Sequence, residues 1–364
     1  MQYFSRRTLG LFLAPLAMFG LLSKYASAEP DPFALGLGDT MARWAATLDE
    51  KQRNRARYDF NDEERFDLRL APLGLEGLRI DEMSDAQWQM LHNALGQVLS
   101  DEGLHKVDTI RSLEREVAEL ENRFFRFVMG GLRDSNRYFL ALFGEPSIKQ
   151  PWGLRFDGHH LSLNWTAVPG APLSITPLFL GGQPRDVPAG LERAGLRVLA
   201  AEEDRAVALL QSMSEKQRAA AEIRFVGGGA FRRPMFVGED PEISLDAPAG
   251  IARTALGPEQ QGLLDALVDV YLANFARPIA DRHRGRIQTE LQSVHFAYAA
   301  GGESAERGLR SGDPFYYRIQ GETFLIEFDD TSAAADHVHV VWREVQGDFG
   351  RDVLDEHYRA HHTH

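Results

Sequence analysis

The fold is decided by the stretch Leu154-Arg-Phe-Asp-Gly-His-His-Leu-Ser-Leu-Asn-Trp165. Apolar and polar residues alternate on both sides of Asp157-Gly158, a pair suited to a tight turn, and this pattern predicts a β-hairpin. A second stretch, Tyr317-Arg-Ile-Gln-Gly-Glu-Thr-Phe-Leu-Ile-Glu-Phe328, alternates in the same way around Gln320-Gly321, 163 residues further on (321 − 158). The chain therefore contains two similar predicted hairpins.

Two predicted helix starts precede each hairpin. Each has Asp, Ser or Gly at the N-cap position and Gln three residues later, which is the spacing of a capping box. The first and third starts are 165 residues apart (213 − 48), and the second and fourth are 173 apart (256 − 83). The four segments are Leu48-Asp-Glu-Lys-Gln-Arg53, Met83-Ser-Asp-Ala-Gln-Trp88, Met213-Ser-Glu-Lys-Gln-Arg218 and Leu256-Gly-Pro-Glu-Gln-Gln261.

Ordered matches at similar offsets predict an internal duplication. We expect an α+β fold of two pseudo-symmetric halves, residues 29–187 and 188–364, each with two helices followed by a β-hairpin. Their strands would share an antiparallel sheet core, and the halves can form one globular domain. Recurring helix starts and ordinary hairpins, without duplication, are the alternative.

Other segments have coarser patterns. An apolar stripe at helical spacing predicts a long amphipathic helix from about Glu102 to Val128. A second helix is expected from Gln261 to Phe275. The stretches Pro169–Pro188 and Gly227–Pro248 are rich in Gly and Pro, which predicts long surface loops.

The N-terminus has the pattern of a bacterial twin-arginine export signal. Arg6 and Arg7 precede an uncharged apolar stretch, and Ala26-Ser-Ala28 follows as a small-residue cleavage site. Residues 1–28 would therefore be removed, the twin-arginine translocation machinery would be a partner, and the mature protein would be periplasmic or secreted. The apolar run is too short to span a bilayer. We expect no membrane span in the mature protein.

Composition limits the chemistry. The chain has no cysteine, which excludes thiolate metal sites, iron–sulfur clusters and cysteine nucleophiles. Without residues 1–28 it has 37 Lys and Arg (40 − 3) against 53 Asp and Glu, a formal charge of −16 (37 − 53). An acidic surface of this kind repels nucleic acid and anionic lipid.

Histidines supply the strongest chemical signal. In His337-Val-His-Val-Val-Trp-Arg343 two histidines are one residue apart, and a β-strand sends residues i and i+2 to the same face. His337 and His339 can therefore supply two ligands to one metal ion. With a turn at Asp157-Gly158, His159 and His160 would face opposite sides of the sheet, so that one of them points inward. A half-exposed strand with a polar histidine face is the alternative.

Glu327, Arg343 and Asp348 are candidates for catalysis, His357 is a further candidate metal ligand, and each has a structural alternative. Glu327 lies between Ile326 and Phe328, so it is either a site carboxylate or an exposed polar position. Arg343 either binds an anionic substrate group or pairs with Asp348 or with Asp352. His357 in a short terminal helix is a ligand or a buried, hydrogen-bonded side chain.

The motifs F-D-G-H-H, I-E-F-D, H-V-H-V-V-W-R, D-F-G-R-D-V-L and H-Y resemble a family of exported bacterial proteins known only as a domain of unknown function. The resemblance covers nearly the whole mature chain, and it departs from the family where Glu344 stands in place of an expected aspartate. It implies no activity. It supports this choice of residues: His159, His160, Glu327, His337, His339, Arg343, Asp348, Asp352 and His357.

These features predict an exported metalloprotein. His337 and His339 would be ligands to a divalent metal, with a third ligand from His159, His160 or Glu327 and water at an open position. Zinc suits such a site and would support hydrolysis of an ester, amide or phosphate bond in a small, anionic substrate. An iron or copper oxidoreductase is the second hypothesis, and a non-catalytic metal- or solute-binding protein is the third.

Overall fold

The computed structural model describes residues 31–69, 74–120, 133–223, 243, 245, 247–300, 308–331 and 336–355. The predicted signal peptide, residues 1–28, lies outside these ranges, as does His357. Most of the predicted loop Gly227–Pro248 also lies outside them.

Helices and strands alternate in blocks along the chain. The α-helices are α1 (Pro32–Ala46), α2 (Glu50–Ala56), α3 (Asp85–Val98), α4 (Asp101–Ser112), α5 (Glu114–Leu120), α7 (Ala200–Ser212), α8 (Glu215–Ala221), α9 (Pro258–Leu272) and α10 (Arg277–Thr289). The strands are β1 (Arg57–Tyr58), β2 (Leu78–Arg79), β3 (Phe139–Phe143), β4 (Trp152–Gly158), β5 (Leu161–Ala167), β6 (Leu178–Gly182), β7 (Ile251–Ala252), β8 (His295–Ala300), β9 (Phe315–Gln320), β10 (Phe324–Asp329) and β11 (Val338–Glu344).

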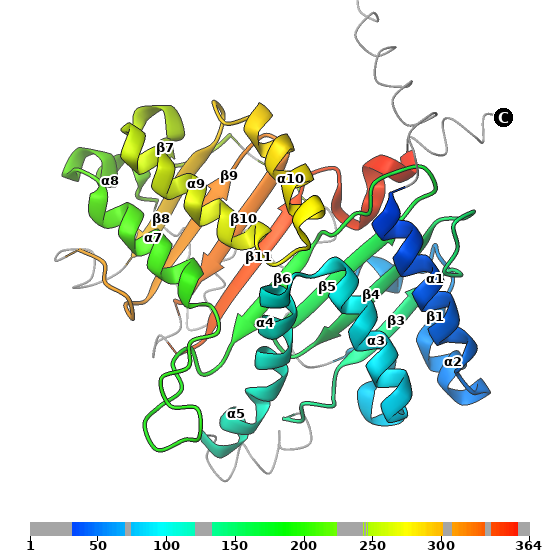
Figure 1. Ribbon diagram of the computed structural model, residues 1–364. Helices are drawn as coiled ribbons and strands as arrows, with labels where there is room; N and C mark the ends of the chain where they lie inside the picture. The colour runs from blue at the N-terminus through cyan, green and yellow to red at the C-terminus, as the bar shows by residue number, and fades with distance from the viewer. Residues whose placement is uncertain are drawn as a thin grey trace, which may run out of the picture.

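All these strands belong to one sheet. Its order is β1-β3-β4-β5-β6-β11-β10-β9-β8-β7, with β2 also paired to β3. β6 is the last strand of the run β3–β6, and β11 is the last strand of the run β8–β11. These two strands lie side by side and antiparallel at the centre of the sheet (Figure 1). β1 pairs with β3 in parallel, so the sheet is mixed. The predicted α+β class is confirmed; the strands from β3 across the centre to β8 pair antiparallel, and the parallel pair lies at the edge of the sheet.

Both predicted hairpins form, but their turns lie further along the chain. In the first hairpin Gly158 pairs with Leu161, so the turn is His159-His160 rather than Asp157-Gly158. Asp157 belongs to β4, where its Oδ2 lies 2.8 Å from Arg155 Nε. Arg155 and Asp157 are two residues apart on β4, so their side chains point to the same face of the sheet and can form an ion pair.

The stretch Pro169–Pro188 was expected to be a surface loop, and this expectation is wrong. It contains β6, which is buried and pairs with β5 and β11. Pro177 immediately precedes the strand, a position where its missing N–H does not interrupt the ladder. The short apolar run Leu178-Phe-Leu180 becomes a central strand because two neighbours cover its edges.

Helices begin where the sequence predicts. The N-caps of α2, α3 and α8 are Asp49, Ser84 and Ser214, each in a reciprocal capping box with Gln three residues later. At α9, Gly257 has no side chain, so Gln260 alone makes the bond, accepting from the Gly257 N–H at 2.9 Å. The predicted long helix from Glu102 is instead α4 and α5, separated at Leu113; residues 121–132 lie outside the described ranges.

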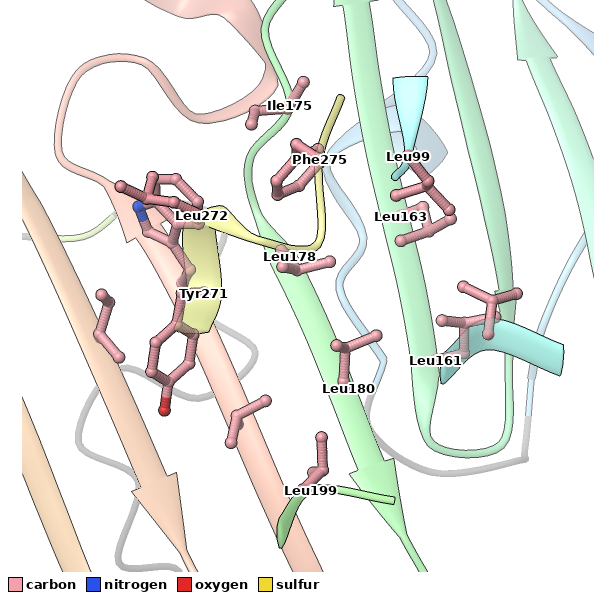
Figure 2. Packing of buried hydrophobic residues seen from close by; sticks show 14 of the residues in the cluster. Leu99, Leu161, Leu163, Ile175, Leu178, Leu180, Leu199, Tyr271, Leu272 and Phe275 are labelled. Atoms are coloured by element: carbon pink, nitrogen blue, oxygen red, sulfur yellow. The ribbon is translucent and has the colours of Figure 1, made fainter. Parts of the chain in front are cut away.

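The main core lies between the helices and one face of the sheet (Figure 1). Strand residues of one parity point into it, including Leu161 and Leu163 of β5 and Leu178 and Leu180 of β6 (Figure 2). Each fully buried leucine of this kind contributes roughly 1.5–3 kcal/mol. The other parity faces away from the helices, and on the central strands it includes His339 and Arg343.

The helix layer is joined across its middle by a backbone bridge. Leu99, after α3, pairs with Phe275, after α9. The Ser100 N–H donates to the Asn274 carbonyl at 3.0 Å, and the Ala276 N–H donates to the Val98 carbonyl at 2.8 Å. Leu99 and Phe275 lie over the central strands (Figure 2).

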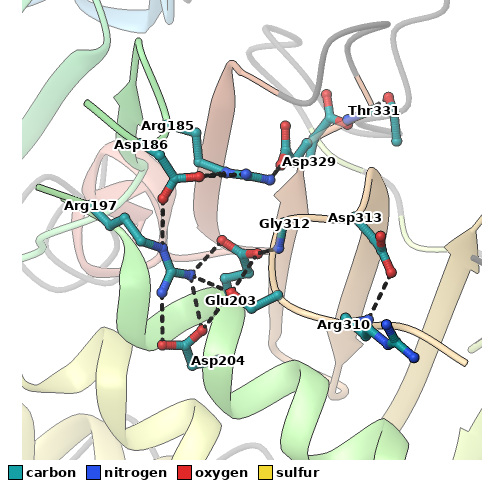
Figure 3. Close-up of polar contacts among 12 residues, drawn as sticks. Arg185, Asp186, Arg197, Glu203, Asp204, Arg310, Gly312, Asp313, Asp329 and Thr331 are labelled. Atoms are coloured by element: carbon teal, nitrogen blue, oxygen red, sulfur yellow. Dashed lines mark hydrogen bonds and ion pairs between the residues drawn. The ribbon is translucent and has the colours of Figure 1, made fainter. Parts of the chain in front are cut away.

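A charged network holds the segment between β6 and α7. Arg185 Nη1 contacts Asp330 Oδ2 at 2.9 Å, and Arg197 Nε contacts Asp186 Oδ1 at 3.1 Å (Figure 3). Arg197 also pairs with Glu203 and with Asp204 on α7, at 2.8 and 2.9 Å. These contacts tie the connecting segment to the end of β10.

Within the described residues, no helix is both long and apolar enough to cross a membrane.

Candidate metal centre

The turn of the first hairpin carries two histidines in a constrained backbone. His160 has φ of 65°, and among the described residues only Phe349 shares a positive φ without being glycine. Non-glycine residues adopt this left-handed conformation at a cost, and such strain is common at functional sites. The rings of His159 and His160 stack with centroids 3.7 Å apart. The expectation that they face opposite sides of the sheet is therefore wrong, because both belong to the turn.

The start of β11 brings two more imidazoles to this turn. His337 precedes the strand, and its Nε2 lies 2.5 Å from His160 Nε2. His339 lies on β11, with its ring centroid 4.4 Å from that of His337 and 5.3 Å from that of His160. Residues 177 positions apart in the chain are thus side by side.

Gly181 on β6 makes room for these rings. Its N–H donates to the His160 carbonyl at 2.8 Å, which places the glycine directly beneath the cluster. A Cβ atom at this position would lie 2.9 Å from His339 Cδ2 and 3.0 Å from His160 Cδ2. A residue with any side chain would therefore displace both imidazoles.

Polar groups from α5 and from the segment before β3 surround His159. Glu114, at the start of α5, places Oε1 2.5 Å from His159 Nδ1. Tyr138 donates its hydroxyl to the His159 carbonyl at 2.7 Å. Arg133 Nη1 lies 2.9 Å from Nδ1 and 3.1 Å from Nε2 of the same ring. Nδ1 and Nε2 point in different directions within the ring plane, so a single Arg133 nitrogen in that plane cannot be close to both. The guanidinium therefore lies over the face of the His159 ring.

Carboxylates on β10 lie near the other side of the cluster. The β10–β11 register pairs Asp329 with His339 and Glu327 with Val341. Asp329 accepts hydrogen bonds from Thr331 N and Oγ1 at 2.9 and 2.8 Å, and its side chain is buried. Glu327 is fully buried and accepts the Tyr316 hydroxyl at 2.6 Å, so it is not the exposed polar position that was one expectation.

The environment of His160, His337 and His339 favours neutral imidazole. Burial, with neighbouring imidazoles adding to it, lowers the pKa of His337 to about 4 and holds the pKa of His160 and of His339 well below the usual range. Burial raises the pKa of Asp329 to about 6. Neutral imidazoles have a free lone pair at neutral pH, which is the form that binds metals.

Two of the predicted catalytic residues lie elsewhere. Arg343 is fully buried on β11, four residues beyond His339 or about 13 Å along the strand. Its Nε lies 2.5 Å from Asp348 Oδ2, and Asp348 also accepts the Glu344 N–H at 2.8 Å. Both side chains are therefore engaged with each other at the opposite end of β11 from the histidines.

Sequence reasoning missed Glu114, Arg133 and Gly181. Glu114 was a polar residue within a predicted amphipathic helix, Arg133 lay in no motif, and Gly181 was assigned to a loop. Neither a spacing rule nor a motif connects these three positions to the histidines. Only the pairing of β6 with β11, and the closeness of α5 to the hairpin turn, reveals them.

The arrangement could hold a metal ion. Ligand nitrogens of His159, His160 and His337 all lie within 4.8 Å of one another, and the three residues are buried or half-buried. Three imidazoles with a fourth position for water form the ligand set of catalytic zinc sites. The geometry itself is compatible with other divalent ions that nitrogen ligands bind.

Comparisons with known proteins identify a family but no activity. No curated protein and no solved structure matches the chain. A family model described as a protein of unknown function matches residues 36–351, a range that includes the hairpin turn, the start of β11, Glu114 and Gly181. The chain therefore belongs to the DUF3500 family, whose function is unknown.

Proposed function

We propose that the protein is a metalloprotein whose centre is formed by His159, His160 and His337. The observation that carries the proposal is the convergence of three imidazoles from a strained turn and a distant strand start. Burying several imidazoles together costs free energy, because each polar ring must find a partner. A divalent cation supplies that partner for all of them at once. His339 lies close enough to serve as a further ligand after small ring movements.

We further propose that zinc is the metal and that the reaction is hydrolysis of a small, anionic substrate. Zinc bound by three imidazoles polarises a carbonyl or phosphoryl oxygen and acidifies a bound water. Arg133 is a cation beside the imidazoles, so it is the residue that we assign to an anionic substrate group. Arg343 is paired with Asp348 away from the cluster, which favours a structural role for both.

Two other functions share the same site. If Glu327 or Asp329 replaces one imidazole, the ligand set suits iron or copper redox chemistry. A closed shell of four histidines, with no position for water, would instead indicate a metal-binding protein without turnover. The identity of the bound metal distinguishes redox chemistry from hydrolysis. The number of protein ligands distinguishes metal binding without turnover from catalysis.

We propose that the protein acts in the periplasm or outside the cell. The support is the twin-arginine pattern at Arg6-Arg7 and the cleavage pattern at Ala26-Ser-Ala28. Twin-arginine export carries folded proteins, so a metal can be inserted before export. The mature chain would begin at Glu29.

We also propose that residues 29–187 and 188–364 descend from a duplication. Outward from the central pair, β5, β4 and β3 follow on one side, and β10, β9 and β8 follow on the other. Gln52 and Gln87 exchange amide hydrogen bonds between two helix starts, at 3.0 and 3.0 Å, and Gln217 and Gln260 do the same at 2.8 and 3.1 Å. Halves that fail to superpose in an experimental structure would contradict the duplication.

The metal proposal is tested by elemental analysis of the full-length precursor after expression, export and purification from the periplasm. We expect one equivalent of divalent metal per chain and an intact mass that begins at Glu29. The double variant His160→Ala plus His337→Ala should lose the metal, because two of the three ligands are removed. His295→Ala is the matched control, since His295 lies on β8 and bonds the Ser293 carbonyl.

Wild-type protein that takes up no metal, even after incubation with zinc, would refute the metal centre. A double variant that keeps a full equivalent would show that the metal binds elsewhere. An intact mass that includes residues 1–28 would count against cleavage.

A further inference from the structure

Glu114 is a buried carboxylate whose position has no evident structural purpose. It is 3% exposed, and its Oε1 lies 2.5 Å from His159 Nδ1. Among the described residues, no donor hydrogen-bonds to its other oxygen, Oε2, although Arg133 Nη1 lies 4.0 Å away. Burying a carboxylate with one oxygen unsatisfied is costly. Buried polar atoms without a hydrogen-bond partner are found at functional sites, where the role of the residue offsets the lost stability.

The contact with His159 fixes which ring nitrogen carries the proton. A carboxylate accepts hydrogen bonds only, so Nδ1 must donate to Glu114. With the proton of the metal-binding form on Nδ1, the lone pair is on Nε2, the nitrogen left for a metal. A carboxylate or carbonyl behind a ligating histidine plays this role in many metal sites.

Other contacts hold the turn and one face of the ring, but they do not select which ring nitrogen donates. Tyr138 holds the His159 carbonyl at 2.7 Å, and the His160 ring stacks against one face of the imidazole. Glu114 is the acceptor at Nδ1, whereas Arg133, which lies over the ring face, is a donor and cannot accept the Nδ1 proton. Removing Glu114 would leave the backbone of the turn in place and release the tautomer and orientation of the ring.

The second half of the chain contains a natural control. Glu290 lies 13 residues after the start of α10, as Glu114 lies 13 residues after the start of α4 (290 − 277 and 114 − 101). Glu290 accepts from Glu322 N at 2.5 Å, Thr323 N at 2.9 Å and Thr323 Oγ1 at 2.5 Å, in the loop after β9. The Glu290 carboxylate therefore accepts hydrogen bonds from a loop, whereas the Glu114 carboxylate contacts an imidazole.

We propose that Glu114 is a positioning residue of the metal centre, which orients His159 for coordination through Nε2. This inference rests on the proposed metal site, because without a bound metal the orientation of His159 has no function.

The test uses the full mature chain and Zn²⁺, with affinity measured by competition with a chromophoric chelator. Glu114→Gln should weaken Zn²⁺ binding about 10- to 100-fold, since loss of such outer contacts typically has this effect. Glu290→Gln should lower thermal stability and leave the Zn²⁺ affinity unchanged. Co²⁺ absorption should change in Glu114→Gln, because His159 would coordinate in a different geometry or not at all.

A double-mutant cycle with His159→Ala separates positioning from general destabilisation. In the His159→Ala background, Glu114→Gln should cause no further loss of affinity, because the ring that it orients is absent. If Glu114→Gln does not fold, Glu114→Asp takes its place in the cycle, with a shorter side chain and the same charge.

Unchanged Zn²⁺ affinity and Co²⁺ absorption in folded Glu114→Gln or Glu114→Asp would overturn the role of Glu114 while leaving the metal centre intact. An equal loss with and without His159 would also overturn it. Wild-type protein that binds no Zn²⁺ would refute the proposed function, and the role of Glu114 with it.

Discussion

Gly181 illustrates how one residue can determine whether the site exists. Two imidazoles from different segments, His160 and His339, pass over its Cα, and no other residue type leaves space for both. The sequence shows only Gly181-Gly-Gln-Pro184, a pattern that is typical of a turn. Its importance arises from what the fold places on top of it.

We expect Gly181→Ala to weaken metal binding at least about 10-fold and to lower the free energy of unfolding by about 1–3 kcal/mol, the usual cost of forcing extra volume into a packed site. The added Cβ would lie 2.9 Å from His339 Cδ2, so the rings must shift. Isothermal titration with Zn²⁺ and urea unfolding measure the two effects.

Gly153→Ala on β4 is the matched control. Its Cβ would meet its nearest atom, the Trp165 carbonyl oxygen, at 3.4 Å, which is an ordinary contact. Wild-type Zn²⁺ affinity in Gly181→Ala would show that the imidazoles do not need their present positions.

At the scale of elements, paired helix starts organise the helix layer. Gln87 on α3 donates to the Thr47 carbonyl and to Gln52 Oε1, both at 3.0 Å. It also accepts from the Ser84 N–H at 2.8 Å and from Gln52 Nε2 at 3.0 Å. One side chain therefore caps its own helix and attaches it to the start of α2, which a capping box by itself does not require.

We expect Gln87→Ala to lower the free energy of unfolding by about 2–3 kcal/mol, because the buried Gln87 amide makes four hydrogen bonds that are all lost. Gln260→Ala, at the start of α9, should cost about 1 kcal/mol, since its pairing with Gln217 is nearer to the surface. Urea unfolding followed by circular dichroism measures both.

Both glutamine variants should bind Zn²⁺ as the wild type does, since neither side chain contacts the histidine cluster. A loss of stability in Gln87→Ala no larger than that in Gln260→Ala would contradict the proposed importance of the Gln52–Gln87 pair.

At the scale of the whole molecule, the proposed metal centre depends on both of the proposed halves of the chain. His159 and His160 come from the first half and His337 from the second, and β6 with β11 holds them together. The connecting segment takes part in the same region: the Arg185 N–H donates to the Asp336 carbonyl at 2.8 Å, next to His337. The Arg185 side chain reaches Asp330, directly after β10.

This arrangement predicts a pH dependence of stability. Burial raises the pKa of Asp330 from 3.8 to about 7, an effect larger than the opposing one of Arg185. A carboxyl group with a raised pKa binds its proton more tightly in the folded state. Its contribution is complete below about pH 4 and is lost as the pH rises through about 7.

We therefore expect the wild type to lose about 1–3 kcal/mol more stability between pH 5 and pH 8 than Asp330→Asn, which lacks this proton equilibrium. Urea unfolding at the two pH values measures the difference. Parallel pH profiles in the two proteins would show that Asp330 titrates normally.

The sequence by itself determined the elements whose signals are local. Helix starts at Asp49, Ser84, Ser214 and Gly257 were predicted because a cap and its glutamine are neighbours in the chain. The two hairpins were predicted because alternation needs only adjacent residues, and the histidines were selected because they stand in unusual contexts.

Tertiary structure alone decided the rest. The hairpin turn moved to His159-His160 because pairing along β4 and β5 sets the register. The segment around Leu178–Gly182 became a central strand because β5 and β11 cover its edges. Glu114 met His159 through contacts 45 residues apart in the chain. Such contacts depend on packing between distant segments, and no local pattern of residues encodes them.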